Sequence, residues 1–489
     1  MNRSFLHGVV ALAIGGFVSG CGDAPGDVAD LVLLNGRVVT VDDALPEAEA
    51  VAMSGARIVA VGSTDDIQGW VGDGTEVVDL EGRLAIPGFI EAHGHYLGLG
   101  EARTILDLTG TTSWQDIVDM VAEAAASAAP GEWIAGRGWH QEKWDEVPSG
   151  PMVDGVPVHA SLDAVSPRNP VLLEHASGHA SYANGLALQM ADVDASTPNP
   201  TGGTIVRDGA GNPTGLLRER AGGAVSQAMS AATGDRSEAE RWAEFDRRVQ
   251  LAAEEALSKG VTTFHDAGTG FTTIDGYRRL ADEGRLPVRL YVMVRGSNEA
   301  MAENLADYRM VGYGDDHLTV RAIKRQIDGA LGSHGAWLLD EYEDMATIGL
   351  TVEDPDDIEE TAALAAQHDY QLNTHAIGDR ANRVVLDIYE RTLGTQAAAG
   401  DHRWRIEHAQ HVNPADVPRF ADLNVIASMQ GVHATSDAPW VFARLGAERA
   451  ENGAYLWRSF MDLGVVIANG TDVPVENISP VASFYSSFV

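Results

Sequence analysis

Short apolar runs alternate with helical segments through most of the chain, and this alternation predicts an α/β fold built as a (β/α)8 barrel. The short runs are typical of strands buried on both faces. The segments between them carry the apolar spacing of amphipathic helices, as at Glu238 to Ser258, Pro355 to His368 and Arg380 to Leu393. About eight strand-like runs can be counted, the number that closes a barrel. They are Leu84 to Ile90, Gly260 to Asp266, Val288 to Val294, Thr319 to Gln326, Tyr370 to His375, Trp404 to His408, Val425 to Met429 and Val465 to Asn469.

A different pattern precedes the barrel. From Ala29 to Leu80 the apolar runs are short, and turn signals such as Asn35-Gly36 and Ser54-Gly55 separate several of them. Short strands at this spacing predict a small sheet, half of a β-sandwich. We therefore expect a β element over residues 29–82 and the barrel domain over residues 83–489.

The interval after the first barrel strand is too long for one βα crossover. It contains a helical stretch at Ser113 to Ala128, strand-like runs at Trp133 to Gly136 and Pro170 to Glu174, and a glycine-rich loop near Thr201. These features predict an inserted lid subdomain over about residues 96–258, at the mouth of the barrel.

The N-terminus resembles a bacterial lipoprotein signal. Arg3 is followed by an apolar run from Val9 to Val18, which is too short for an ordinary membrane span, and then by Val18-Ser-Gly-Cys21. We expect residues 1–21 to be a signal peptide ending at a lipidated Cys21, with residues 22–28 as a linker. The protein would then be lipid-anchored in the cell envelope, facing the periplasm or the outside. The alternative is a plain secretory signal and a secreted protein.

The charge balance limits the partners. With 34 basic and 71 acidic residues, the formal net charge is -37, which repels nucleic acid and anionic lipid headgroups. The single cysteine rules out an intramolecular disulfide and a thiolate metal cluster. A small-molecule substrate is the expected partner, with the membrane reached only through the lipid anchor, and homo-oligomer formation is left open.

Two histidines and several later polar residues stand where a barrel carries its chemistry. His93 and His95 are two residues apart on a strand-like run, so both imidazoles can face one ion. Lys324, His375, His408 and Asp472 each end a later apolar run, and the C-terminal ends of barrel strands meet at one face. Each also has an ordinary reading. His93 and His95 could be solvated in a polar turn, and His375 and His408 could be buried and satisfied by backbone. Lys324 could form a surface ion pair, and Asp472 could be an Asx-turn residue beside Pro474.

The motifs around these residues resemble those of the amidohydrolase superfamily, in particular its family-3 branch. That branch is similar to the N-substituted formamide deformylases and, more distantly, to the D-aminoacylases. The resemblance implies a distorted (β/α)8 barrel that carries a small β-sandwich. The motifs are Pro87-Gly-Phe-Ile-Glu-Ala-His-Gly-His95, Gly178-His179, Asn184, Gly202-Gly203, Thr214-Gly215, Arg321-Ala-Ile-Lys-Arg-Gln-Ile-Asp-Gly-Ala-Leu-Gly-Ser333, His375-Ala-Ile-Gly-Asp379, Arg405-Ile-Glu-His408 and Gly470-Thr-Asp472.

The same resemblance implies a metal centre with one or two divalent ions. His93 and His95 would bind one ion and His375 and His408 a second. Lys324, carboxylated by carbon dioxide to a carbamate, would bridge them. Asp472 would complete the first site and act as the catalytic general base. Imidazole and carboxylate ligands suit zinc, which we expect as the metal.

Three further residues are candidates for substrate binding. They are Trp139, His179 and His334. His334 lies in Gly332-Ser-His-Gly-Ala336, where many family members have Gly-Ser-Arg-Thr-Ala, so it could replace an arginine contact.

Together with these residues, the resemblance implies a metal-dependent hydrolase that cleaves a C-N bond of a small non-peptide amide, formamide or N-acyl compound through metal-bound hydroxide. One alternative is hydrolysis of an N-acyl amino acid or of a cyclic amide or ester. A second is a non-catalytic, lipid-anchored binding protein that uses the same barrel. Val489 follows Asp472 after only a short apolar segment. We therefore also expect the C-terminal part of the barrel and sandwich to be missing.

Overall fold

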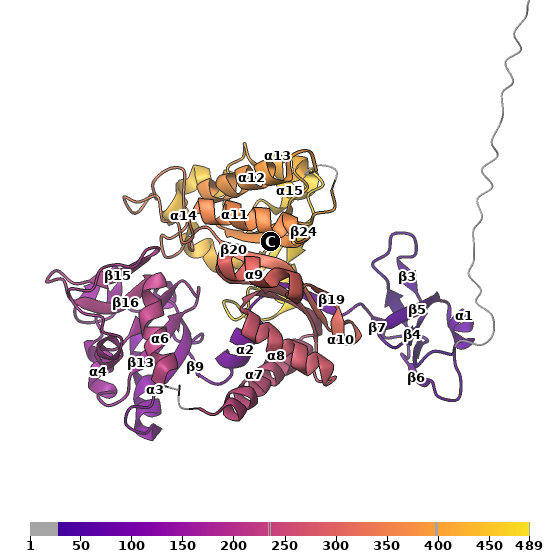
Figure 1. Ribbon diagram of the computed structural model, residues 1–489, viewed down its shortest axis with the longest axis horizontal. Coiled ribbons are helices and arrows are strands. Elements are labelled where there is room, and N and C mark those ends of the chain that lie inside the picture. The colour runs from indigo at the N-terminus through magenta and orange to yellow at the C-terminus, as the bar shows by residue number, and fades with distance from the viewer. Residues whose placement is uncertain (1–27, 233, 235, 397–399, 489) are drawn as a thin grey trace, which may run out of the picture. The chain divides into compact units, whose positions relative to one another are not determined.

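The computed structural model describes residues 28–232, 234, 236–396 and 400–488. The expected signal peptide, Cys21 and most of the linker lie outside these residues. The described residues form two compact units, with the boundary in the chain between Pro87 and Gly88 (Figure 1). None of the described helices is long and apolar enough to cross a bilayer.

The first unit consists of two small sheets. The four-stranded sheet has the order β5-β4-β1-β6 and the three-stranded sheet the order β3-β2-β7. Val32, Ala52 and Ile67 lie in its small apolar core. The elements are β1 (Leu31–Leu34), β2 (Arg37–Val39), β3 (Glu47–Ala48), β4 (Ala50–Ser54), β5 (Arg57–Gly62), α1 (Thr64–Gln68), β6 (Glu76–Asp79) and β7 (Leu84–Ala85).

One predicted boundary differs at the junction of the two units. The run from Leu84 to Ile90 was expected to be a single barrel strand. Instead, β7 pairs with β2 in the small sheet, and the first barrel strand begins at Phe89. Pro87 lies between the two strands and has no N–H group for a ladder, which interrupts the run.

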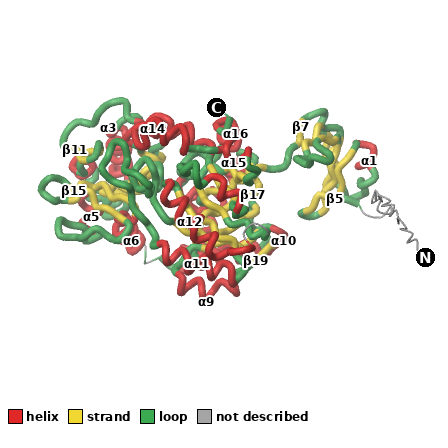
Figure 2. The backbone as a smooth tube through the Cα atoms, turned by 90° about the horizontal axis from the view of Figure 1, so that it is seen from above, coloured by secondary structure: helices red, strands yellow, loops and turns green. Residues whose placement is uncertain are grey.

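The second unit contains the predicted barrel, and the fold class is confirmed. Eight parallel strands follow one another around it, while β19 (Met310–Gly312) pairs antiparallel with β20. In Figure 2 helices such as α11 and α12 lie outside these strands. The barrel strands are β8 (Phe89–Gly94), β17 (Val261–Thr269), β18 (Arg289–Val294), β20 (Leu318–Gln326), β21 (Gln371–Ala376), β22 (Arg405–His408), β23 (Ile426–Met429) and β24 (Ile467–Asn469).

Residues just after β24 connect the last strand to the first. The Thr471 N–H donates to Glu91 Oε1 at 2.7 Å, and the Asp472 N–H donates to the His93 carbonyl at 2.7 Å. The His95 N–H in turn donates to the Val473 carbonyl at 2.7 Å. These bonds hold Asp472 beside the two histidines of β8.

The helices around the barrel start where the sequence supplies caps. Ser237 and Glu240 form a capping box at the start of α7, and Asp354 caps α11 ahead of Pro355. The helices are α2 (Tyr96–Ala102), α7 (Glu238–Ser258), α8 (Phe271–Asp282), α9 (Asn298–Tyr308), α10 (Tyr313–Asp316), α11 (Pro355–Gln367), α12 (Asp379–Leu393), α13 (Val417–Asp422), α14 (Gly431–Gly453), α15 (Trp457–Asp462) and α16 (Pro480–Ser486).

A six-stranded sheet with its own apolar core is inserted between α2 and α7. Its strand order is β15-β16-β14-β13-β10-β9, and Ile117, Trp139 and Tyr182 lie in its core. Tyr96 of α2 and Val249 of α7 instead belong to the barrel core. The elements are β9 (Leu106–Asp107), α3 (Trp114–Ser127), β10 (Ile134–Trp139), β11 (Met152–Val153), β12 (Val156–Pro157), α4 (Ala160–Val165), β13 (Val171–His175), β14 (Ala180–Ala183), α5 (Gly185–Met190), β15 (Gly203–Arg207), β16 (Pro213–Glu219) and α6 (Gly223–Ala232).

Candidate metal centre

All six predicted metal ligands line one cavity at the C-terminal ends of the barrel strands. They come from five strands that are far apart in the sequence, so the barrel alone brings them together. His93 lies on β8 and His95 directly follows it, Lys324 lies on β20, His375 on β21, His408 on β22, and Asp472 follows β24.

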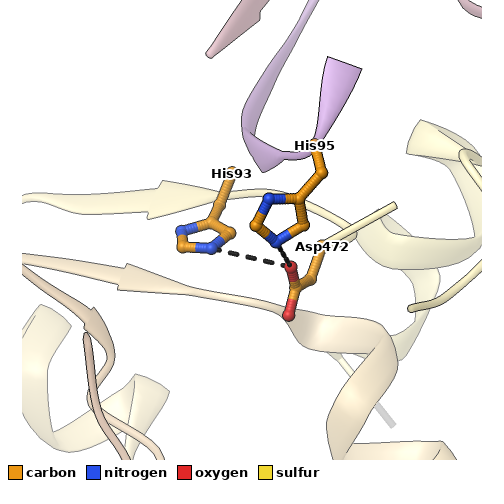
Figure 3. A group of neighbouring side chains, drawn as sticks. All are labelled: His93, His95 and Asp472. Carbon is orange, nitrogen blue, oxygen red and sulfur yellow. Dashed lines mark ion pairs between the residues drawn. The ribbon is translucent and has the colours of Figure 1, made fainter. Parts of the chain in front are cut away.

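His93, His95 and Asp472 converge on one point (Figure 3). Asp472 Oδ1 lies 3.2 Å from His95 Nε2 and 3.6 Å from His93 Nε2. Burial alone would raise the pKa of Asp472, but His93 and His95 hold that pKa well below its usual range. An ionised carboxylate between two imidazoles can share a single cation with them.

A buried carboxylate orients the ring of His93 by bonding to the ring nitrogen that faces away from the cavity. His93 Nδ1 bonds to Glu407, and the Arg405 guanidinium donates to Glu407 Oε1 at 2.6 Å. Burial would raise the pKa of Glu407, but Arg405 and His93 hold it well below its usual range. With Nδ1 occupied, Nε2 faces the cavity. Carboxylate–histidine pairs of this kind orient metal ligands in many proteins.

Lys324 is a buried lysine whose side chain ends among the candidate ligands. It is 3% exposed, and its Nζ lies 3.2 Å from His93 Nε2. Burial lowers its pKa to about 8. Among the described residues its amine forms no ion pair within 4.0 Å. This is an unusual environment for a lysine with only a structural role.

His375 and His408 complete the cluster. Their ring centroids are 4.5 Å apart, and the His408 ring is 4.8 Å from that of His93. His408 Nδ1 bonds to Gln430 Oε1 at 2.7 Å, which leaves Nε2 for the cavity. His375 Nε2 lies 3.4 Å from Asp328 Oδ1 and Asp472 Oδ1 lies 3.2 Å from His95 Nε2, but both buried atoms lack a hydrogen bond of good geometry. Unsatisfied buried atoms of this kind fit a bound cation, because such atoms are otherwise costly.

Sequence reasoning did not select His433 as a ligand, but it lies beside the cluster. His408, His433 and Asp472 each offer one possible ligand atom, a ring nitrogen or a carboxylate oxygen. These three atoms lie within 4.8 Å of one another. His433 Nε2 is buried and has no hydrogen-bond partner. The available signal was its position just after β23, at the start of α14.

His179, one of the three predicted substrate-binding residues, also reaches the cluster. Its ring centroid lies 5.3 Å from that of His375. His179 lines the cavity that contains the six candidate ligands and also a neighbouring cavity. His179 Nδ1 lies 2.9 Å from Glu219 Oε2. Glu219 was not predicted because it lies 40 residues away in sequence, at the end of β16.

The other two predicted substrate-binding residues lie elsewhere. Trp139 is packed in the core of the insert, and its indole N–H donates to the Leu173 carbonyl at 3.1 Å. His334 Nε2 lies 3.0 Å from Asp344 Oδ1. Trp139 and His334 line a separate cavity, which is also lined by Arg444.

The six-residue cluster lines one cavity and borders a second. His408 and Asp472 line both of them. The first cavity contains all six candidate ligands together with Arg137 and Arg295. The second is walled by the β13–β14 connection and by the N-terminal half of α14. A substrate centred on the cluster can therefore extend into either cavity.

Comparisons with known proteins identify related chains. A model described as the amidohydrolase family matches residues 76–489. Protein LONG AFTER FAR-RED 3 of Arabidopsis thaliana is 35% identical over 480 residues, covering 94% of this chain and 77% of its own. The N-substituted formamide deformylase of Arthrobacter pascens is 29% identical over 469 residues, which cover 92% of this chain and 82% of the deformylase. An uncharacterized metal-dependent hydrolase of Pyrococcus horikoshii shares the fold, with a TM-score of 0.71 at 24% identity. The match covers 93% of this chain and 85% of the hydrolase.

Proposed function

Because the chain belongs to the amidohydrolase family and is a hydrolase of carbon–nitrogen bonds other than peptide bonds, we propose that its substrate is a small amide, formamide or N-acyl compound. The observation that carries this proposal is the convergence of four imidazoles, one carboxylate and one buried lysine in a single cavity. The likeness to an N-substituted formamide deformylase supports a formamide as the first compound class to test.

We assign two ion positions to the cluster. His93, His95 and Asp472 would hold the first ion, and His375 and His408 the second. Nitrogen and oxygen donors suit zinc, and the unsatisfied His375 Nε2 and Asp472 Oδ1 support a bound cation. When bound, such an ion activates water and polarises a carbonyl at neutral pH.

Lys324 would join the two positions as a carbamate. Its neutral amine attacks carbon dioxide, a nitrogen–carbon bond forms, and the amine proton leaves to solvent. The product is an anionic oxygen donor, whereas an ammonium cannot act as a ligand. Support comes from the burial of Lys324 and from its position 3.2 Å from His93 Nε2.

Asp472 and His179 would act on the substrate itself. Asp472 would accept the proton of the attacking water and return it to the leaving nitrogen, a general acid–base role. His179, held through Nδ1 by Glu219, would present Nε2 to the substrate carbonyl. Both residues line the two cavities beside the cluster, which supports contact with substrate.

We also propose that the protein is anchored to the cell envelope through a lipid on Cys21. This proposal rests on the Val18-Ser-Gly-Cys21 sequence alone. Expression of the full chain with Cys21→Ser should release the protein from the membrane fraction or leave its signal uncleaved. Unchanged membrane partitioning of that variant would refute the proposal.

A substrate panel tests the proposed activity. Zinc-loaded protein is incubated with N-substituted formamides, N-acetyl amines and N-acyl amino acids, and the released acid and amine are quantified. We expect turnover of at least one compound, lost in His408→Ala and kept in His368→Ala. His368 is the matched control because it lies at the C-terminal end of α11, outside both cavities. Equal turnover in both variants would contradict the proposal.

A further inference from the structure

One face of α14 leads away from the metal centre. His433, Ser436, Asp437 and Trp440 are spaced at i, i+3, i+4 and i+7, so they share one helix face. All four line the second cavity, together with His408 and Asp472. At a rise of about 1.5 Å per residue, Asp437 lies about 6 Å and Trp440 about 10 Å along the helix axis from His433.

The carboxylate of Asp437 is held by neutral groups. Its Oδ2 accepts hydrogen bonds from the Tyr455 hydroxyl and, at 3.1 Å, from the Gln410 amide. Among the described residues, neither Asp437 nor the nearby Glu476 forms an ion pair with a lysine or arginine within 4.0 Å. Burial raises the pKa of Asp437 to about 6, so it is mostly ionised at neutral pH. A carboxylate in this setting lacks a cationic partner.

A second observation points to a ligand in this cavity. His433 is 9% exposed, and its Nε2 has no hydrogen-bond partner although it lines the cavity. Leu331, Ile377 and Trp440 supply apolar wall. Lys143 also lines the cavity, but its side chain is exposed. The cavity thus combines apolar walls, an unsatisfied imidazole and unpaired carboxylates beside the reaction centre.

We propose that this cavity is a subsite for a protonated amine. The substrate would carry its ammonium group beside Asp437, about one helical turn of α14 beyond His433. Asp437 would pair with the ammonium, Glu476 would add negative potential, and the connecting methylene groups would pack on the apolar wall. This inference rests on the proposed function, because the metal centre defines where the carbonyl lies.

Two hydroxamates of similar size and shape test the subsite without requiring hydrolysis. Hydroxamates chelate metal ions, so both probes would be anchored at the centre. The first, 4-aminobutanehydroxamic acid, carries an ammonium three methylenes from its carbonyl, and the second, pentanehydroxamic acid, ends in a methyl group instead. The dissociation constant of each is measured by calorimetry on the zinc-loaded protein. We expect the amino compound to bind about tenfold more tightly or better, as for a partly desolvated charge pair.

The variant Asp437→Asn should remove this preference and leave the affinity for pentanehydroxamic acid unchanged. Asparagine can still accept the bonds from Tyr455 and Gln410, so the fold is expected to persist, and binding of the neutral probe verifies it. Glu476→Gln should reduce the preference by a smaller factor. The matched control is Asp422→Asn, an exposed change on α13, which should leave the preference intact.

The outcomes separate the subsite from the proposed function. Equal affinities in the wild type, or a preference that survives Asp437→Asn, would overturn the subsite. Failure of both probes to bind zinc-loaded protein would overturn the metal centre and the subsite with it. A preference that depends on Asp437, in a protein that hydrolyses none of the amides tested, would support the subsite and refute the proposed function.

Discussion

His93 Nδ1 bonds to the buried carboxylate of Glu407, although the two residues are 314 positions apart. This bond leaves Nε2 of His93 as the only ring nitrogen free to face Asp472 and Lys324. Arg405 supports Glu407 from the same strand through a 2.6 Å hydrogen bond. The first and sixth strands of the barrel are therefore coupled through the orientation of one imidazole.

This coupling predicts that Glu407→Gln weakens metal binding. The neutral amide keeps the shape of Glu407 but loses its ionic bonds to His93 and Arg405, so the ring of His93 is less firmly oriented. We expect zinc affinity to fall by about 10-fold to 100-fold, the usual scale for such partners. Competition with a fluorescent chelator gives the affinity. The exposed change Glu341→Gln serves as control, and identical affinities in both variants would contradict the assigned role.

A second prediction concerns Asp472. This residue has a φ of +57°, a backbone region that asparagine tolerates well, so Asp472→Asn should preserve the local fold. The loss of its proton-transfer role should lower kcat by about a hundredfold or more. Circular dichroism and residual zinc content verify the fold. Near-native kcat would remove Asp472 from the proposed mechanism.

The carbamate on Lys324 makes a spectroscopic prediction. Protein prepared with carbon-13-labelled bicarbonate should show a carbamate carbon signal that is missing from Lys324→Met. Removal of carbon dioxide should reduce bound zinc, and bicarbonate should restore it. A wild-type protein that is fully loaded with zinc but shows no labelled carbamate signal would show that Lys324 is not carboxylated.

The amine subsite predicts a pH-dependent preference. The pKa of Asp437 is about 6 because of burial, and its neighbours include His433, Glu476 and Tyr455. As the pH falls through this value, Asp437 gains a proton and loses its attraction for an ammonium. The preference for 4-aminobutanehydroxamic acid over the neutral probe should therefore be smaller at about pH 5 than at about pH 8. A ratio that does not change between these two pH values would argue against pairing through Asp437.

The strands of the barrel could be predicted because each contains a short apolar run, and several of these runs end at a polar residue. The same feature explains why His375 and His408 were found: each ends such a run, on β21 and β22. The start of β8 was misplaced because Pro87 divides one continuous apolar run between two units.

The residues that sequence reasoning missed are brought to the site only by tertiary contacts. Glu219 lies at the end of a strand in the insert, and His433 and Asp437 lie on a helix whose apolar spacing says nothing about its active-site face. His334 directly follows a predicted motif in the sequence, and Trp139 lies in the insert, but both line a different cavity. Trp139 could not be placed from the sequence because the insert folds around its own core.

Metal analysis combined with activity tests the central claim most directly. The protein is purified, treated with a chelator, and reloaded with measured amounts of zinc, and its zinc content and amide hydrolysis are determined on the same samples. The account predicts that activity rises with bound zinc to one or two equivalents, and that His93→Ala loses both. A protein that is free of transition metal and remains fully active would contradict the account.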